Sequence, residues 1–155
     1  MSLPLRLALA LFLVAAAGVD LRTGRVPNRL TLPLMAIGAL YSALVLRSGW
    51  FVLPWAVIYA FWRFGAYGGG DAKLLMALFA FAPVPAYNKL ALCLAVSMGL
   101  AGLVTGWKQY GGLLPFLVGV RNALSGAVSR QALLASARPF TWAFALGGLW
   151  FLIVL

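Results

Sequence analysis

The sequence predicts an all-α membrane protein with six transmembrane helices and a cytoplasmic interfacial amphipathic helix between the fifth and sixth spans. Of its 155 residues, 65% are apolar and only 9% are charged, whereas soluble domains carry about 25% charged residues. The mean hydropathy is +1.02, and long apolar runs recur along the whole chain. We therefore expect residues 1–155 to form a single integral membrane domain.

The first apolar run extends from Leu3 to Val19 and is expected to be the first span. Its small residues at 15–17 leave open a second interpretation, a cleaved signal peptide. A signal peptide carries its positive charge before the apolar run. Here Arg22, Arg25 and Arg29 follow the run instead, and further spans come after it, which favours a membrane helix.

The next three spans are separated by turn residues and cations. The second is expected from Leu30 to Leu46, and the third from Trp50 to Phe64. A glycine-rich loop over residues 65–70 follows the third span. The fourth span starts near Ala72 and stops around Pro83, because proline cannot supply the helical N–H.

The fifth span is predicted from Lys89 to about Trp107 and the last from about Phe140 to Leu155. Gly102 and Gly106 in the fifth span have the four-residue spacing that permits close contact between helices.

Between these two spans, over residues 111–137, the pattern changes. Apolar residues recur there every three or four positions with arginines and serines between them, which predicts an amphipathic helix lying in the membrane interface. A seventh span is the alternative, but Pro115 and the arginines disfavour it.

The cations set the orientation, because cytoplasmic loops carry an excess of Lys and Arg. If the loop after the first span is cytoplasmic, nine cations lie inside and three outside, and both chain ends lie outside. The inner nine are Arg22, Arg25, Arg29, Arg63, Lys73, Lys108, Arg121, Arg130 and Arg138. The outer three are Arg6, Arg47 and Lys89.

Composition also excludes several classes of function. The net charge of +10 is spread singly between apolar runs, which is typical of membrane orientation and lipid contact rather than of nucleic-acid binding. With one cysteine, Cys93, and no histidine, the chain offers neither an internal disulfide nor His-based catalysis. Most zinc chemistry is excluded for the same reason, so we expect no metal and no cofactor.

The chain contains only two acidic residues, Asp20 and Asp71. Asp20 follows the first run and Asp71 opens the fourth, so counting spans puts both on the same face of the membrane. Each has a structural interpretation: Asp71 suits the N-cap of the fourth span, and Asp20 could be solvated or paired with Arg22.

The functional interpretation is an aspartyl protease pair, in which two neighbouring carboxylates share one proton. This chemistry needs no metal, cofactor or nucleophilic side chain. The glycines at 68–70 then have a purpose, because backbone without Cβ atoms lets a peptide approach closely. A flexible connector remains the alternative, whereas a phosphate-binding loop lacks its Gly-Lys-Ser/Thr ending.

The motif Gly68-x-Gly70-Asp71-x-Lys73, preceded by Asp20-x-Arg22 and Val26-Pro27-Asn28, resembles the type IV prepilin peptidase family of bacterial membrane aspartyl proteases. The small size is most similar to the branch that processes Flp-type pilins. The stretch that begins Arg138-Pro139-Phe140 also resembles the opening of that family's last span.

The resemblance implies that Asp20 and Asp71 are catalytic and that the reaction is hydrolysis of a prepilin leader at the cytoplasmic side of the inner membrane. The substrate is then an Flp-type prepilin with a hydrophobic N-terminal helix. The residues expected to support the motif or the substrate are Gly68, Gly70, Lys73, Arg22, Pro27 and Asn28.

Larger relatives carry a cysteine-containing cytoplasmic insertion after the first span and also methylate the new N-terminus. This chain lacks the insertion, so we expect peptidase activity without N-methyltransferase activity. Presenilin-like proteases share Gly-x-Gly-Asp but pair tyrosine with their first aspartate, whereas Val19 precedes Asp20 here. Archaeal preflagellin peptidases are a nearer alternative. Outside the proteases, the alternatives are a small proton- or cation-coupled transporter, or a pilus assembly factor.

Overall fold

The computed structural model describes residues 1–24, 26–64, 68–110 and 141–155, and within these ranges every regular element is a helix. The all-α fold class is therefore confirmed, and each of the six predicted apolar runs is helical. The predicted amphipathic helix over residues 111–137 lies outside the described residues. The elements are α1 (Leu3–Thr23), α2 (Asn28–Leu44), α3 (Val52–Arg63), α4 (Gly69–Phe81), the short 3-10 helix η1 (Val84–Ala86), α5 (Tyr87–Tyr110) and α8 (Thr141–Val154).

By length and composition alone, two stretches of the described chain are able to cross a membrane, Leu3–Thr23 and Val84–Thr105. Helix α8 is equally apolar in character but has only 14 residues. Large apolar side chains are nevertheless exposed on the outside of the helices, as at Leu11 (72%) and Ile153 (81%). Such an exterior fits a lipid environment, whereas the number of six transmembrane spans stays a prediction.

Helix α1 extends one turn beyond the predicted end of the first span. Gly24 ends it in the left-handed region with a φ of 67°, and the Gly24 N–H donates to the backbone carbonyl of Asp20 at 2.7 Å. This is a common way to end a helix, because glycine adopts positive φ without a steric penalty. Asp20 therefore lies in the last turn of α1 rather than beyond it.

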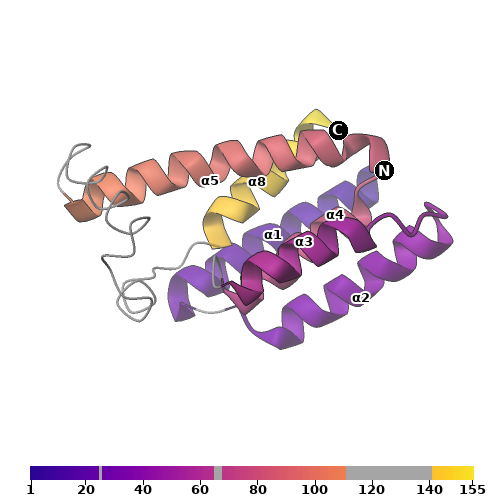
Figure 1. Ribbon diagram of the computed structural model, residues 1–155, viewed down its shortest axis with the longest axis horizontal. Helices are drawn as coiled ribbons and strands as arrows, with labels where there is room; N and C mark the ends of the chain where they lie inside the picture. The colour runs from indigo at the N-terminus through magenta and orange to yellow at the C-terminus, as the bar shows by residue number, and fades with distance from the viewer. Residues whose placement is uncertain (25, 65–67, 111–140) are drawn as a thin grey trace.

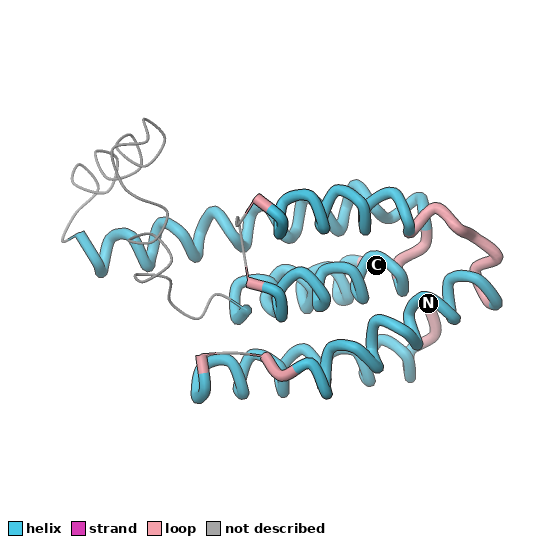
Figure 2. Tube along the Cα trace, turned by 60° about the horizontal axis from the view of Figure 1, so that its bottom comes forward, coloured by secondary structure: helices cyan, strands magenta, loops and turns pink. Residues whose placement is uncertain are grey.

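Consecutive helices run in alternate directions, so that the two ends of the bundle collect different parts of the chain (Figure 1). The end of α1 and the starts of α4 and α8 lie together at one end, whereas the two chain termini lie at the other. In a second view the helix axes remain roughly aligned (Figure 2). Helix α4 packs against α2 and α3, and α8 packs between α1 and α5.

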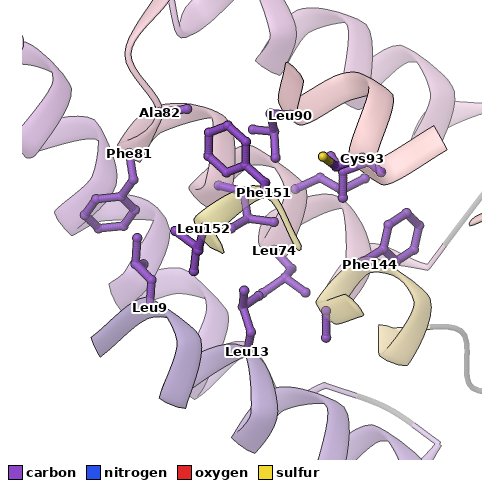
Figure 3. Close-up of a cluster of buried hydrophobic side chains, with 14 of the residues drawn as sticks. Leu9, Leu13, Leu74, Phe81, Ala82, Leu90, Cys93, Phe144, Phe151 and Leu152 are labelled. Atoms are coloured by element: carbon purple, nitrogen blue, oxygen red, sulfur yellow. The ribbon is translucent and has the colours of Figure 1, made fainter. Parts of the chain in front are cut away.

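The core lies between α1, α4, α5 and α8 (Figure 3). Its largest fully buried apolar side chains are Leu13, Leu74, Leu90, Phe144 and Phe151.

Two glycines of α8 allow its close packing against both neighbours. An added Cβ would lie 2.9 Å from Leu94 Cα of α5 at Gly147, and 2.8 Å from Leu13 Cδ1 of α1 at Gly148. At Gly102, nothing in the described part of the chain lies within 4 Å of an added Cβ, so these residues show no close helix contact there. The surroundings of Gly106 lie outside what the structure describes.

Candidate active site

The two acids come from different helices and lie at the same end of the bundle. Asp20, in the last turn of α1, is buried with 3% of its surface exposed. Asp71 is partly buried in the first turn of α4. Span counting predicted that both would share one end, and both line one cavity.

Asp71 is not the N-cap of α4, contrary to one expectation from the sequence. Gly68 occupies the cap position with extended backbone, and the helix begins at Gly69. Asp71 is the third helical residue, and its carboxylate accepts a hydrogen bond from the backbone N–H of Gly68. A carboxylate at this position that reaches back to the cap residue is half of a capping box, so Asp71 satisfies a free N–H from inside the helix.

Thr141, the first described residue of α8, contacts both carboxylates. Its backbone N–H donates to Asp20 Oδ2 at 3.1 Å, and its hydroxyl donates to Asp71 Oδ1. Only 2% of the Thr141 surface is exposed. Three helices that are distant in sequence are thus joined at a single residue.

These groups surround a cavity of about 300 Å³, the size of a small site for a few peptide atoms and water. Within the described residues its lining contains two titratable side chains, both carboxylic. The lining residues are Asp20, Gly24, Val26, Gly68, Gly69, Gly70, Asp71 and Thr141.

The glycines of the Gly68-x-Gly70-Asp71 motif have distinct steric roles. A Cβ added to Gly70 would lie 3.1 Å from both the Cβ and the carbonyl oxygen of Val26, in the link between α1 and α2. At Gly68 it would lie 3.3 Å from Asp71 Oδ2. Gly70 therefore lets the α1–α2 link approach α4, and Gly68 leaves room for the carboxylate to turn back. Gly69 faces Trp62 Nε1 at an ordinary 3.4 Å.

Two more of the predicted site residues contact one another rather than the cavity. Lys73 Nζ donates to Asn28 Oδ1 at 2.5 Å, which ties the start of α2 to the start of α4. Asn28 and Pro27 also line a neighbouring groove of about 550 Å³, and Val26 belongs to the lining of both spaces.

Arg22 is exposed in the last turn of α1 and is not among the described residues that line either space. Of the motif residues, the structure thus brings Gly68, Gly70 and the two aspartates into the cavity lining. Pro27 and Asn28 line the neighbouring groove instead, and Lys73 is bonded to Asn28.

Sequence reasoning missed Thr141. A threonine two residues after Pro139 at the start of an apolar span carries no chemical pattern of its own. Its position next to the Arg138-Pro139-Phe140 motif was the one available signal.

Helix ends act electrostatically on both carboxylates, and at Asp20 two helix ends act with opposite sign. Asp20 meets the negative end of the α1 dipole, which is unfavourable for an anion. Its Oδ2 also accepts the Thr141 N–H at the start of α8, where the dipole is positive. Asp71 lies at the positive start of its own helix. The site can therefore hold negative charge and a proton on neighbouring carboxyl groups, which is the requirement for acid–base hydrolysis of a peptide.

In the described part of the chain, no three His, Cys, Asp or Glu side chains cluster as metal ligands would. The chemistry available to the described residues of this site is that of two carboxyl groups, one hydroxyl and backbone amides.

Comparisons with known proteins identify the family of this chain. The type IV leader peptidase family matches residues 7–109, a range that includes Asp20 and Asp71. A prepilin leader peptidase/N-methyltransferase from Burkholderia pseudomallei, found in two strains, is 31% identical over 109 residues, covering 62% of this chain and 35% of the relative. Prepilin peptidase EppA from Methanothermobacter thermautotrophicus is 33% identical over 75 residues, covering 41% of this chain and 20% of the relative.

The aligned part of this chain thus spans about a third or less of these relatives' lengths. No solved structure matches the chain. Because the family match covers well over half of the chain and contains both aspartate motifs, the protein belongs to the type IV leader peptidase family.

Proposed function

We propose that this protein is a membrane-embedded aspartyl endopeptidase that removes the N-terminal leader from type IV prepilins, of the Flp type, at the cytoplasmic face of the inner membrane. The observation that carries the proposal is the meeting of the chain's only two acids, Asp20 and Asp71, around Thr141 in one cavity. The family match and the names of the two relatives support the same activity.

In the proposed reaction, one carboxyl group of the pair is ionised and the other protonated. The ionised group takes a proton from water, whose oxygen attacks the carbonyl carbon of the scissile peptide. The protonated group gives its proton to the carbonyl oxygen, which yields a tetrahedral diol. One diol hydroxyl then gives its proton back to the second carboxylate, the first carboxyl protonates the amide nitrogen, and the C–N bond breaks. A carboxylic acid and an amine leave, and the pair again holds one proton.

The remaining motif residues have steric and structural roles in the proposed site. Gly68 and Gly70 keep the cavity open beside Asp71, because side chains at these positions would meet its carboxylate or Val26. Lys73 and Asn28 fasten α2 to α4 beside the adjoining groove, where Pro27 is also found. Arg22, exposed on the same turn as Asp20, is suited to contact a substrate or anionic lipid.

The orientation is supported by the charges at the two ends of the bundle. Arg22, Arg29, Arg63 and Lys73 lie at or near helix ends on the carboxylate side. Arg6, Arg47 and Lys89 lie toward the other side. By the positive-inside rule the carboxylate end is cytoplasmic, both described chain ends are periplasmic, and the chain is a single multi-pass domain.

We further propose that the protein does not methylate the new N-terminus. The link between α1 and α2 comprises residues 24–27 only, so this junction holds no cysteine-bearing insertion. A transporter or an assembly factor using the same carboxylates is the competing function. It is disfavoured because both carboxylates lie at helix ends and already accept hydrogen bonds from Thr141.

The test is co-expression with an Flp-type prepilin, scored by loss of the leader on a gel and by mass spectrometry of the new N-terminus. We expect wild type to cleave without methylation, and Asp20→Asn and Asp71→Asn each to lose about a thousandfold or more in rate, since each removes an essential proton carrier. Arg47→Gln, at the opposite end of the bundle, is the matched control and should cleave normally. Cleavage by either Asn variant at the wild-type rate would refute the aspartyl mechanism.

A further inference from the structure

Thr141 contributes two different donors to two different carboxylates. Its backbone N–H donates to Asp20 Oδ2 at 3.1 Å, and its hydroxyl donates to Asp71 Oδ1. We infer that Thr141 is a positioning residue that holds Asp20 and Asp71 together as one pair in the absence of substrate.

The geometry of this bridge is stiff. The Thr141 N–H belongs to the backbone of α8. The hydroxyl is attached to Cβ, and because threonine is branched there, rotation about χ1 is restricted. The residue is 2% exposed, so packing also limits its movement. The three partners come from α1, α4 and α8, and the two bonds span 121 and 70 positions of sequence. The bridge thus fixes the separation of two carboxylates that α1 and α4 alone would leave free to vary.

The Thr141 hydroxyl favours one protonation state of the carboxylate that it contacts. A donor to a carboxylate stabilises the ionised form relative to the protonated form. Asp71 also accepts a hydrogen bond from the Gly68 N–H. Asp20 and Asp71 are the two titratable residues in the described lining of the cavity, so each carboxyl group faces the other. Of the two motif cations, Lys73 lies two residues after Asp71 and donates to Asn28, and Arg22 lies two residues after Asp20 and is exposed. Removing the Thr141 hydroxyl should therefore disfavour the ionised state of Asp71.

Three substitutions separate the hydroxyl from the rest of the residue. Thr141→Ser keeps both donors, Thr141→Val replaces the hydroxyl by a methyl group of similar size, and Thr141→Ala removes it without adding atoms. Thr31→Val is the matched control, because Thr31 on α2 is fully buried and its hydroxyl has no hydrogen-bond partner among the described residues. Circular dichroism and thermal unfolding in detergent check that each variant folds.

The first readout does not depend on activity. Because Asp20 and Asp71 are the only acidic residues, protein labelled with carbon-13 at the aspartate side-chain carboxyl gives two carboxyl signals. Asp20→Asn and Asp71→Asn assign these signals. In Thr141→Val and Thr141→Ala the Asp71 signal should titrate at higher pH than in wild type, because its hydroxyl donor is gone. In Thr141→Ser and Thr31→Val it should titrate as in wild type.

The second readout rests on the proposed function. With the prepilin substrate, loss of a hydrogen bond to a charged group predicts a fall in kcat/KM of about tenfold to a hundredfold for Thr141→Val and Thr141→Ala. The acidic side of the pH–rate profile should move to higher pH, in parallel with the titration. Thr141→Ser loses one methyl group and should stay within about fivefold of wild type.

The inference is overturned if Thr141→Val and Thr141→Ala titrate like wild type, or if Thr31→Val shifts the carboxyl signals equally. Failure of the wild type to cleave any prepilin would refute the proposed function instead, and the carboxyl titration would still decide the role of Thr141.

Discussion

At the scale of single residues, the site depends on small side chains as much as on acidic ones. Gly70 meets both the backbone and the side chain of Val26, so the α1–α2 link can lie against the first turn of α4. Gly69, the preceding residue in the same turn, has only an ordinary contact with Trp62. Of these two neighbouring glycines, only Gly70 is required by a close contact.

Gly70→Ala is predicted to destabilise the protein and to slow cleavage. The added methyl group would lie 3.1 Å from the Val26 carbonyl oxygen, closer than an ordinary contact, and overpacking of this kind costs about 1–3 kcal/mol. Gly69→Ala, in the same helical turn, should be neutral or should stabilise by up to about 1 kcal/mol through helix propensity. Thermal unfolding in detergent and prepilin cleavage measure both effects. Equal stability of the two variants would show that the close approach to Val26 is unimportant.

At the scale of helices, α8 holds the bundle together because it packs between α1 and α5. Gly147 lies against the backbone of α5, where an added Cβ would meet Leu94 Cα at 2.9 Å and the Cys93 carbonyl oxygen at 3.0 Å. Backbone atoms cannot rotate away, so only separation of the helices would make room. Because α8 begins at Thr141, its seating on α5 also determines where the carboxylate bridge lies.

Gly147→Ala is therefore predicted to lower the free energy of unfolding by about 1–3 kcal/mol and to reduce cleavage by displacing Thr141. Gly99→Ala in α5 is the control, because no described residue has an atom within 4 Å of its added Cβ. That variant should be unchanged or more stable by up to about 1 kcal/mol. Unfolding in mixed detergent micelles measures both, and a Gly147→Ala variant as stable as Gly99→Ala would contradict the packing argument.

At the scale of the whole molecule, the helices differ in length. Helix α1 has 21 residues and a length of about 32 Å, whereas α3 has 12 residues and a length of about 18 Å. A hydrocarbon core is about 30 Å thick. If α3 crosses the membrane, the bilayer beside it must thin or its flanking residues must enter the interface. One end of α3 lies at the carboxylate end of the bundle. A thinner bilayer beside α3 would therefore bring water closer to the site.

The orientation of the bundle predicts that the two ends of α3 face opposite compartments. Trp50 and Phe64, just beyond its two ends, are 65% and 81% exposed. In a Cys93→Ala background, Trp50→Cys should react with a membrane-impermeant maleimide in spheroplasts. Phe64→Cys should react only after lysis. Labelling of Phe64→Cys in intact spheroplasts would place the carboxylate end outside and contradict the proposed cytoplasmic site.

The sequence by itself determined the helices and their order, and it singled out Asp20 and Asp71 as the candidate pair. Apolar runs, glycines and prolines act locally, and counting alternate spans was enough to put both acids at the same end. It did not determine what joins them. The Thr141 bridge, the approach of Val26 to Gly70 and the bond between Lys73 and Asn28 were decided only by the tertiary structure. Each of these contacts joins residues far apart along the chain, and their side-chain types fit many other positions, so only the packing of helices brings them within bonding distance.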